Sequence, residues 1–247
     1  MNVVKIMGGL GNQLFQYAIG KHLEQYDSIG FDISYYESEI NKNGSVPHRD
    51  FLLPCFVDGL VYAEQDGRKR VNQWEYDATR AYTDSWFFGD WQRAIFFADT
   101  KLNIRLKDKY ITDDARALAA QMAKENSVAI HVRRTDYSNF GWILDESYYN
   151  RALGKIRRLV NNPKFYIFSD DLGWCLYHFR GIISEYVYKG DLLDFWLMSQ
   201  CKHNIIANSS YSFWAAYLNE NSEKVVVYPK NWICTANVTD GLDWEGV

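Results

Sequence analysis

Short apolar runs alternate with amphipathic stretches through the second half of the chain. Runs rich in β-branched and aromatic side chains predict buried strands. They lie at 127–133, 164–169, 184–188, 204–207 and 224–229. Stretches that predict helices lie between them, over 146–160, for a short distance from 170, over 191–201 and over 209–219. Strands that alternate with helices in this way predict a parallel sheet with helices on both faces.

The front of the chain opens with the same pattern. The predicted elements are a strand over 3–7, a glycine-rich turn over 8–13, a helix over 12–25 and a strand over 29–33. Residues 34–110 are rich in aromatic and polar side chains, and they predict only short helices and loops. A helix returns over 112–125. We therefore expect an α/β protein with an amino-terminal lobe over 1–125 and a carboxyl-terminal lobe over 126–247.

Four polar segments stand where predicted strands end. They are GGLGNQ (8–13), HVRRTDY (131–137), SDD (169–171) and NSSYS (208–212). In an open α/β sheet, ligands bind at the carboxyl ends of the strands and against the amino termini of helices. Four candidates at one edge indicate a binding site there more strongly than any single segment.

The segment HVRRTDY carries two adjacent arginines, which are costly to bury unless an anion meets them. Guanidinium groups suit phosphate oxygens and keep their charge. Strand alternation sends Arg133 and Arg134 to opposite faces, so we expect one to meet a ligand. The alternative is an ion pair between Arg134 and Asp136. We interpret His131 as a ligand-facing or sheet-edge residue, because no second histidine stands at metal-ligand spacing.

Hydroxyl and carboxylate side chains follow two further strands. Ser209, Ser210 and Ser212 stand at a predicted helix start, where hydroxyls and free N–H groups can hold a phosphate. Simple helix capping is an equally good interpretation of these serines. Asp170, in the segment SDD, has the same two interpretations: a helix cap, or an acceptor for a base or ribose.

The glycine-rich turn is a near match to the dinucleotide-binding fingerprint. Leu14 stands where a third glycine belongs, and Asp32 stands near the position of a ribose-binding acid. Asn12 and Gln13 can either bind a ligand or close the turn itself. The pattern keeps an NAD-dependent nucleotide-sugar oxidoreductase open as an alternative function, although that function leaves HVRRTDY and NSSYS without roles.

Composition and charge narrow the possible partners. A formal net charge of -4 gives no electrostatic support for binding nucleic acid. No apolar stretch approaches the roughly 20 residues that span a bilayer, and the amino terminus lacks the pattern of a secretory signal. The four cysteines are far apart, as expected of reduced thiols in a cytosol. We therefore expect a cytoplasmic protein, with peripheral contact at the inner face of the membrane left open.

Aromatic residues make up 17% of the chain, with nine tryptophans and eighteen tyrosines. Most are expected to pack in the core, and a few could line a sugar site. A non-catalytic glycan-binding module would explain these aromatic residues, but it would not explain the paired arginines. The sequence also contains no Asp-x-Asp, so the usual carboxylate clamp for a metal on a nucleotide sugar is missing.

Several motifs resemble those of one known family. GGLGNQLFQYA (8–18) resembles the opening of the bacterial α-1,2-fucosyltransferases, glycosyltransferase family eleven. HVRRTD (131–136) is similar to the His-x-Arg-Arg-x-Asp motif that the family shares with other fucosyltransferases. The run from Asp194 to Leu218 resembles the third motif almost throughout, and FSDD (168–171) also fits. The resemblance spans residues 1 to about 232, through motifs that are long and ordered.

The resemblance implies a GT-B-like architecture, with two Rossmann-like lobes that contain parallel sheets and a donor site mainly in the second lobe. Because the chain is short for the family, a reduced first lobe is expected. The resemblance also implies an inverting galactoside 2-α-L-fucosyltransferase that needs no metal or cofactor. Its donor would be GDP-fucose, and its acceptor an oligosaccharide or lipid-linked glycan of a bacterial cell-surface polysaccharide, through the 2-hydroxyl of a terminal galactose.

Residue roles follow from the resemblance position by position. Arg133 is similar to the arginine that binds the β-phosphate of the donor, and His131 to a residue near the guanosine. The serines Ser209, Ser210 and Ser212 resemble further pyrophosphate contacts. Asn12 is similar to an active-site residue from the other lobe. Separately from the resemblance, Asp136 is a candidate general base because of its nearness in sequence, with an ion pair to an arginine as the favoured alternative.

Overall fold

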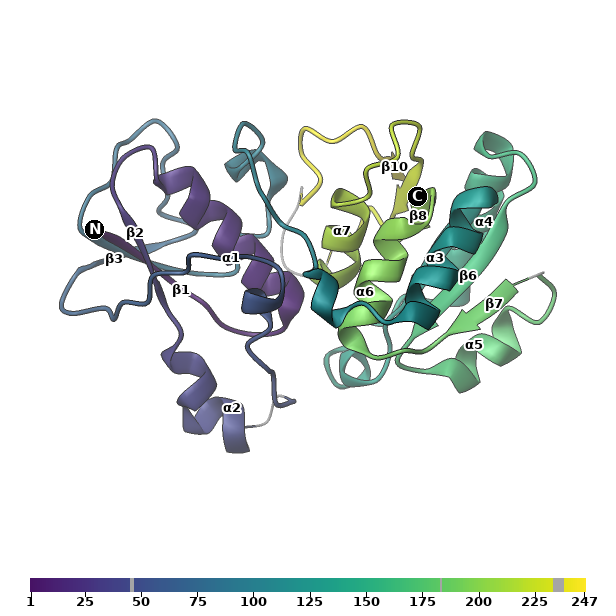
Figure 1. Cartoon of the computed structure of the whole chain (residues 1–247), viewed down its shortest axis with the longest axis horizontal. Helices are drawn as coiled ribbons and strands as arrows, with labels where there is room; N and C mark the ends of the chain where they lie inside the picture. Colours follow the sequence, from purple (N-terminus) through teal and green to yellow (C-terminus); the bar gives the residue numbers. More distant parts are fainter. Residues whose placement is uncertain (45–46, 183, 233–237) are drawn as a thin grey trace. The chain divides into compact units, whose positions relative to one another are not determined.

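Two separate parallel sheets organise the chain in the computed structural model, which describes residues 1–44, 47–182, 184–232 and 238–247. The first sheet belongs to a unit formed by Met1–Arg105 together with Asn237–Leu242. The second belongs to a unit formed by Leu106–Ala236 together with Asp243–Val247. In Figure 1 the first unit is mostly purple and blue, and the second runs from teal to yellow.

The first sheet has the strand order β2-β1-β4-β3, and all its neighbouring strands are parallel. Its strands are β1 (Asn2–Lys5), β2 (Ile29–Asp32), β3 (Lys69–Asn72) and β4 (Ser85–Phe88). Helix α1 (Leu10–Leu23) connects β1 to β2, and the short α2 (Glu39–Asn43) follows β2. The prediction of only short helices and loops over 34–110 was wrong for β3 and β4, because strands of four residues are too short to show a period.

The glycine-rich turn is closed by its own glutamine. Gln13 is fully buried, and its Nε2 donates to the carbonyls of Gly8 at 3.1 Å and Asp50 at 2.8 Å. Gly8 has a φ of 78°, and a Cβ there would lie 3.0 Å from Nδ2 of Asn12. The turn therefore requires glycine at this position, and Gln13 serves the turn rather than a ligand.

The second sheet has the strand order β10-β9-β8-β5-β6-β7 and is parallel throughout. Its strands are β5 (Ser127–Val132), β6 (Lys164–Ser169), β7 (Ser184–Val187), β8 (His203–Ile205), β9 (Val226–Tyr228) and β10 (Glu245–Gly246). Its helices are α3 (Asp113–Lys124), α4 (Glu146–Leu159), α5 (Leu172–His178), α6 (Asp191–Gln200) and α7 (Ser210–Tyr217). The sequence predicted each of these elements except β10, with bounds within a few residues.

The residues of β5 alternate between the two faces of this sheet. Val128, Ile130 and Val132 are buried in an apolar cluster with side chains of α4 and α5. On the other face, the ring of His131 lies 5.5 Å from the ring of Tyr211 in α7. The sheet is therefore covered on both faces, as the alternating pattern predicted.

The two units divide between Arg105 and Leu106, whereas the sequence placed a boundary near residue 125. Helix α3 belongs to the second unit, because it packs against α6. There, Sγ of Cys201 lies 3.7 Å from Sδ of Met122. The chain later returns to the first unit, where Nη2 of Arg93 lies 3.1 Å from Oδ2 of Asp240 and the amide of Ala94 donates to Val238.

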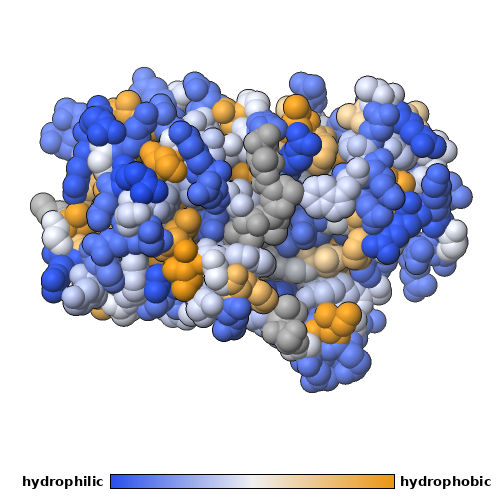
Figure 2. Space-filling model, turned by 180° about the vertical axis from the view of Figure 1, so that it is seen from behind, coloured by the Kyte–Doolittle hydropathy of each residue, from blue (hydrophilic) through white to orange (hydrophobic). Residues whose placement is uncertain are grey.

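The face seen in Figure 2 is mostly hydrophilic, and its apolar residues form small separate patches. Every helix of the described ranges is too short or too polar to cross a membrane. Cys55, Cys175 and Cys201 are free thiols, and Cys234 lies outside the described residues.

Candidate functional site

The strand order of the second unit has a topological switch point at β5. From β5 the chain proceeds to β6 and β7 on one side, and it later returns on the other side with β8, β9 and β10. Open α/β sheets bind ligands in the crevice at the carboxyl ends of the strands beside such a point. Three of the polar segments, over 131–137, 169–171 and 208–212, follow β5 and its neighbours β6 and β8. The fold therefore brings them to one edge.

The register of β5 and β6 sets the contacts of Arg133. Val132 pairs with Ser169, so the next residues of both strands are neighbours. Nη2 of Arg133 lies 2.8 Å from Oδ1 of Asp136, and its Nη1 lies 3.2 Å from Oδ2 of Asp170. Burial lowers the pKa of Arg133, but the hydrogen bond to Asp136 and the charge of Asp170 outweigh it and raise the pKa overall. Two carboxylates thus hold this guanidinium in place.

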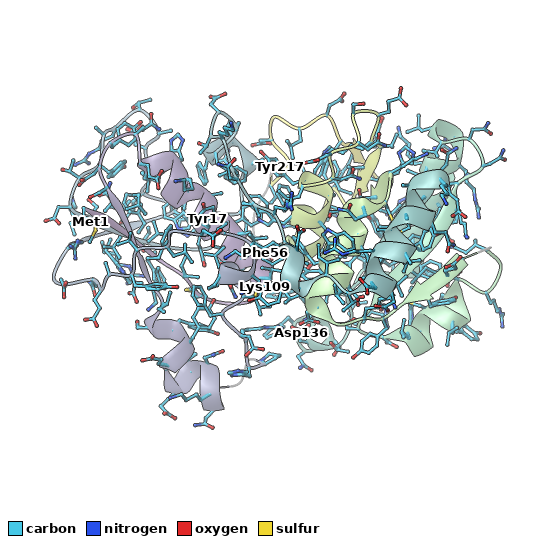
Figure 3. All side chains as sticks on the ribbon, in the orientation of Figure 1. Met1, Tyr17, Phe56, Lys109, Asp136 and Tyr217 are labelled. Atoms are coloured by element: carbon cyan, nitrogen blue, oxygen red, sulfur yellow. The ribbon has the colours of Figure 1, made fainter. Side chains whose placement is uncertain are left out.

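Arg134 lies on the opposite face, as strand alternation predicted. Its Nε donates to Oδ2 of Asp171 at 3.2 Å, and its guanidinium carbon lies 4.4 Å from the ring centre of Trp174 in α5. The expected ion pair with Asp136 was therefore assigned to the wrong arginine. Asp136, labelled in Figure 3, pairs with Arg133 instead, because a side chain three residues along the turn returns to the same face.

Asp170 organises the loop that carries both arginines. Its Oδ1 accepts the backbone N–H of Arg134 at 2.9 Å. Its Oδ2 accepts the backbone N–H of Thr135 at 3.2 Å and the hydroxyl of Thr135 at 2.6 Å. Asp171 caps α5 through the N–H of Trp174 at 2.9 Å. Both oxygens of Asp170 thus serve the loop, and its direct contact with a base or ribose stays a prediction.

His131 is a neutral, buried side chain at this edge. It is 5% exposed, and its Nδ1 has no hydrogen-bond partner among the described residues. Burial, followed by the charge of Arg133, lowers the pKa of His131 to about 3. A buried ring nitrogen without a hydrogen-bond partner costs folding free energy. A ligand group bound at the switch point could supply the missing hydrogen bond.

The pKa of His131 predicts how stability depends on pH. Between pH 6.5 and about 3 the unfolded state binds the proton and the folded state does not. Stability is therefore lost as pH falls through that window, by about 2 kcal/mol at pH 5. We expect His131→Gln to lose less stability than the wild type between pH 7 and pH 5, in denaturant unfolding at both pH values. Parallel losses in both proteins would show that His131 is not the cause.

The three serines divide between the edge and the core. Ser209 precedes α7 as its N-cap residue, and its side chain makes no capping hydrogen bond. Ser210 is partly exposed at the first position of the helix. Ser212 is 1% exposed, and its hydroxyl donates to the carbonyls of Ala207 and Ser209 at 3.4 and 3.3 Å. The structure thus brings Ser209 and Ser210 to the edge and turns Ser212 inward.

Aromatic side chains tie the loop after β5 to the start of α7. Nδ2 of Asn208 donates to the carbonyl of Trp142 at 2.9 Å, and the hydroxyl of Tyr137 donates to the carbonyl of Asn208 at 3.5 Å. The rings of Phe140 and Trp142 are stacked with their centres 4.6 Å apart, and both are exposed. Phe140 and Trp142 were not singled out in the sequence, where only the general excess of aromatic residues pointed to them, whereas Tyr137 and Asn208 lie in the polar segments HVRRTDY and NSSYS.

In the first unit, Asn12 lies in a polar cluster at the ends of β1 and β4. Its Nδ2 donates to Oδ1 of Asp90 at 3.3 Å, and its Oδ1 accepts from Nε2 of Gln92 at 3.0 Å. Asp90 and Gln92 were missed in the sequence because the strand before them was not predicted. The available signal was the polar segment GDWQ (89–92), which directly follows an aromatic run.

The carboxylate of Asp32 makes its polar contacts with other residues of the first unit. It is 5% exposed, with Oδ1 3.1 Å from Nζ of Lys5 and Oδ2 accepting from Nε1 of Trp86 at 3.2 Å. The backbone N–H of Ser34 also donates to its Oδ1. The residue proposed for a ribose in the NAD alternative therefore serves the sheet, and that alternative loses its main support.

The second unit combines cationic and hydrogen-bonding groups that suit a phosphorylated ligand. At this edge stand a guanidinium fixed by two carboxylates, a helix start whose N-cap residue makes no side-chain hydrogen bond, and a buried imidazole with an unpartnered nitrogen. Over the described ranges, no three His, Cys, Asp or Glu side chains gather in a way that could hold a metal ion. Arg133 and the backbone dipoles at the start of α7 are positive groups that a phosphate could meet here.

Known proteins match this chain over most of its length. The chain is 28% identical to an α-1,2-colitosyltransferase of Escherichia coli, over 93% of this chain and 91% of that protein. It is 25% identical to galactoside 2-α-L-fucosyltransferase SEC1 of Bos taurus, over 87% of this chain and 63% of that protein.

The solved structure of the fucosyltransferase NodZ from Bradyrhizobium shares the fold. It has 14% sequence identity and a TM-score of 0.55, over 87% of this chain and 91% of that one. NodZ, an α-1,6-fucosyltransferase, has also been crystallised with GDP. At this identity the likeness shows a GT-B-like fold, in agreement with the two parallel-sheet units.

The family profile described as glycosyl transferase family 11 matches residues 73–240. That range contains the arginine motif, the aspartate pair after β6 and the serines before and within α7. The motifs recognised in the sequence, the GT-B-like fold and the profile agree: this chain is a glycosyltransferase that belongs to glycosyl transferase family 11.

Proposed function

We propose that this enzyme transfers L-fucose from GDP-fucose to the 2-hydroxyl of a terminal galactose in a glycan. The observation that carries the proposal is the guanidinium of Arg133, fixed by two carboxylates at the switch point of the second sheet. The galactoside 2-α-L-fucosyltransferases among the relatives support the sugar and the linkage. The GDP complex of NodZ supports the nucleotide.

The donor roles follow from the chemistry of each group. Arg133 binds the β-phosphate, and Ser209 and Ser210 with the first N–H groups of α7 bind the remaining pyrophosphate oxygens. His131 lies near the guanosine, where a donor group of the ligand can meet its unsatisfied Nδ1. Ser212 and Asp170 act through the positions of α7 and of the arginine loop.

Departure of GDP builds negative charge that must be stabilised. Without the Asp-x-Asp clamp, we propose that Arg133 and the dipoles at the start of α7 stabilise the leaving phosphate. The acceptor hydroxyl then attacks the anomeric carbon directly, and its configuration inverts. Asp136 is engaged with Arg133 at 2.8 Å, which favours a role in holding the arginine over a role as the base.

A second donor is favoured by one observation. The α-1,2-colitosyltransferase relative, at 28% identity, transfers colitose, a 3-deoxy analogue of L-fucose. The same nucleotide site would serve either donor, because the groups described above address the diphosphate and the base. The acceptor is proposed to be an oligosaccharide or a lipid-linked glycan, handled in the cytoplasm or at the inner face of the membrane.

Turnover with GDP-fucose and a galactoside tests this function. We expect GDP release that depends on the acceptor and survives excess EDTA, because arginine and backbone dipoles take the place of a cation. NMR of the product should show a 2-linked fucose with inverted anomeric configuration. GDP-colitose in a parallel reaction ranks the two donors. Activity lost in EDTA and restored by manganese or magnesium would refute metal independence, and a 3- or 6-linked product would refute the linkage.

A further inference from the structure

Two large aromatic side chains stand exposed on the loop that follows β5, in the unit that carries Arg133. The loop begins with a 3₁₀ turn at Asp136, which is labelled in Figure 3. Phe140 is 48% exposed and Trp142 is 37% exposed, although side chains of this kind usually bury most of their surface. Their rings are stacked, with centres 4.6 Å apart and planes at 24°. The pair forms a flat apolar surface, which we call the aromatic platform.

Backbone contacts hold the aromatic platform in place. Gly141, between the two aromatic residues, has a φ of 68°, and the N–H of Trp142 donates to the carbonyl of Tyr137 at 3.1 Å. The left-handed glycine reverses the chain, so that side chains two residues apart can stack. The carbonyl of Trp142 accepts from Nδ2 of Asn208 at 2.9 Å, which ties the loop to the start of α7. A surface fixed in this way loses little conformational freedom when a ligand binds to it.

The aromatic platform lies close to Arg133. The guanidinium carbon of Arg133 is 5.6 Å from the ring centre of Tyr137, and that ring centre is 5.6 Å from the ring centre of Trp142. A phosphate bound at Arg133 would therefore be separated from the platform by a distance that a sugar residue can span. All these residues belong to the second unit.

A buried hydrogen-bond acceptor beside the platform lacks a partner. Asn208 is 6% exposed, and its Nδ2 donates to the carbonyl of Trp142, which fixes the orientation of the amide. Among the described residues, no group donates to its Oδ1. An unsatisfied buried acceptor costs folding free energy, and a sugar hydroxyl is a donor that could supply the missing hydrogen bond. An apolar surface beside such an acceptor suits a pyranose, which has an apolar face and a rim of hydroxyls.

Galactose in particular has the shape for this surface. Its 4-hydroxyl is axial, so the hydrogens on C3, C4 and C5 share one face of the ring and make that face apolar. Such a face can pack on aromatic rings and leave the hydroxyls at the edge free for hydrogen bonds. We propose that the aromatic platform and Asn208 form the binding site for the terminal galactose of the acceptor glycan. This proposal rests on the proposed function and names the groups that select the acceptor.

The test removes both rings. In the double variant Phe140→Ala/Trp142→Ala, we expect KM for methyl β-galactoside to rise roughly tenfold. The affinity for GDP, KM for GDP-fucose and kcat at saturating acceptor should stay unchanged, because a surface that binds the substrate and the transition state equally affects KM alone. Phe140→Tyr/Trp142→Phe keeps two flat rings and should retain most of the acceptor affinity. Tyr177→Ala, at a tyrosine of α5 that is 62% exposed, is the matched control and should behave as the wild type.

Saturation-transfer NMR gives a second measurement that needs no variant. With GDP present, saturation from the wild-type protein should be strongest at the hydrogens on C3, C4 and C5 of the galactoside. Even saturation around the ring, or a near-normal acceptor KM in the folded alanine variant, would overturn the proposal. A higher KM for GDP-fucose with an unchanged acceptor KM would also overturn it, and would assign the platform to the donor sugar. A wild type that binds GDP but transfers no sugar to a galactoside would instead defeat the proposed function.

Discussion

Arg133→Ala is expected to lower turnover by two to three powers of ten, roughly 3–4 kcal/mol in the barrier to transfer. The guanidinium stands at the switch point, held by Asp136 and Asp170 at 2.8 and 3.2 Å. In the proposed role it meets the donor phosphate, so we expect its contribution to be greatest when charge builds on the leaving group. Arg133→Lys should recover only part of the rate, because an ammonium keeps the charge and loses the two-pronged geometry.

Arg134→Ala is the matched control for this prediction. The two side chains are similarly exposed, at 23% for Arg133 and 20% for Arg134. Arg134 packs on Trp174 and pairs with Asp171, so its loss should lower the melting temperature and leave most of the turnover. Because Arg133 also pairs with two carboxylates, its replacement by alanine should cost stability too. Steady-state kinetics and thermal unfolding on all three variants decide the matter: near-normal turnover of a folded Arg133→Ala enzyme would contradict the assigned role.

Asp170→Ala is expected to reduce both turnover and stability. The carboxylate accepts hydrogen bonds from the backbone N–H groups of Arg134 and Thr135 and from the hydroxyl of Thr135. It also forms an ion pair with the guanidinium of Arg133. We expect a stability loss of roughly 2–3 kcal/mol. Turnover should fall roughly a hundredfold, because the loop then no longer fixes Arg133 to within about 1 Å.

Asp171→Ala separates the two effects of that change. Asp171 caps α5 and pairs with Arg134, so its removal should cost about 1 kcal/mol of stability with little change in turnover. Urea unfolding and initial rates measure both quantities. Equal loss of turnover in the two variants would show that the position of the loop does not depend on Asp170 in particular.

The sequence predicted the second unit better than the first, for a physical reason. Strands β5 and β6 are six residues long and buried, and their neighbouring helices carry a clear apolar stripe. Strands β3 and β4 have only four residues each, and β3 (KRVN) is largely exposed. Their conformation comes from pairing outside the strand itself, β3 with β4 and β4 also with the distant β1, which no local pattern records.

The placement of site residues could be predicted where strand alternation fixes the face of the sheet to which a side chain points. That argument placed Arg133 and Arg134 on opposite faces, as the structure shows. It could not identify Asp170 as the support of the loop, because that contact depends on the register between β5 and β6. The orientation of Ser212 depends on how α7 packs, and Asp90 lies after a strand that was not predicted. What the sequence could not supply in each case was a long-range contact.

The return of the chain to the first unit has a consequence for how such enzymes can be recombined. Because residues 237–242 belong with 1–105, and 243–247 belong with the second unit, the chain changes unit three times. A chimera that joins the front of one relative to the back of another at a single crossover would inherit mismatched partners for Arg93 and Ala94, which contact Asp240 and Val238. Exchange of the whole first unit between relatives would therefore require residues 237–242 to travel with residues 1–105.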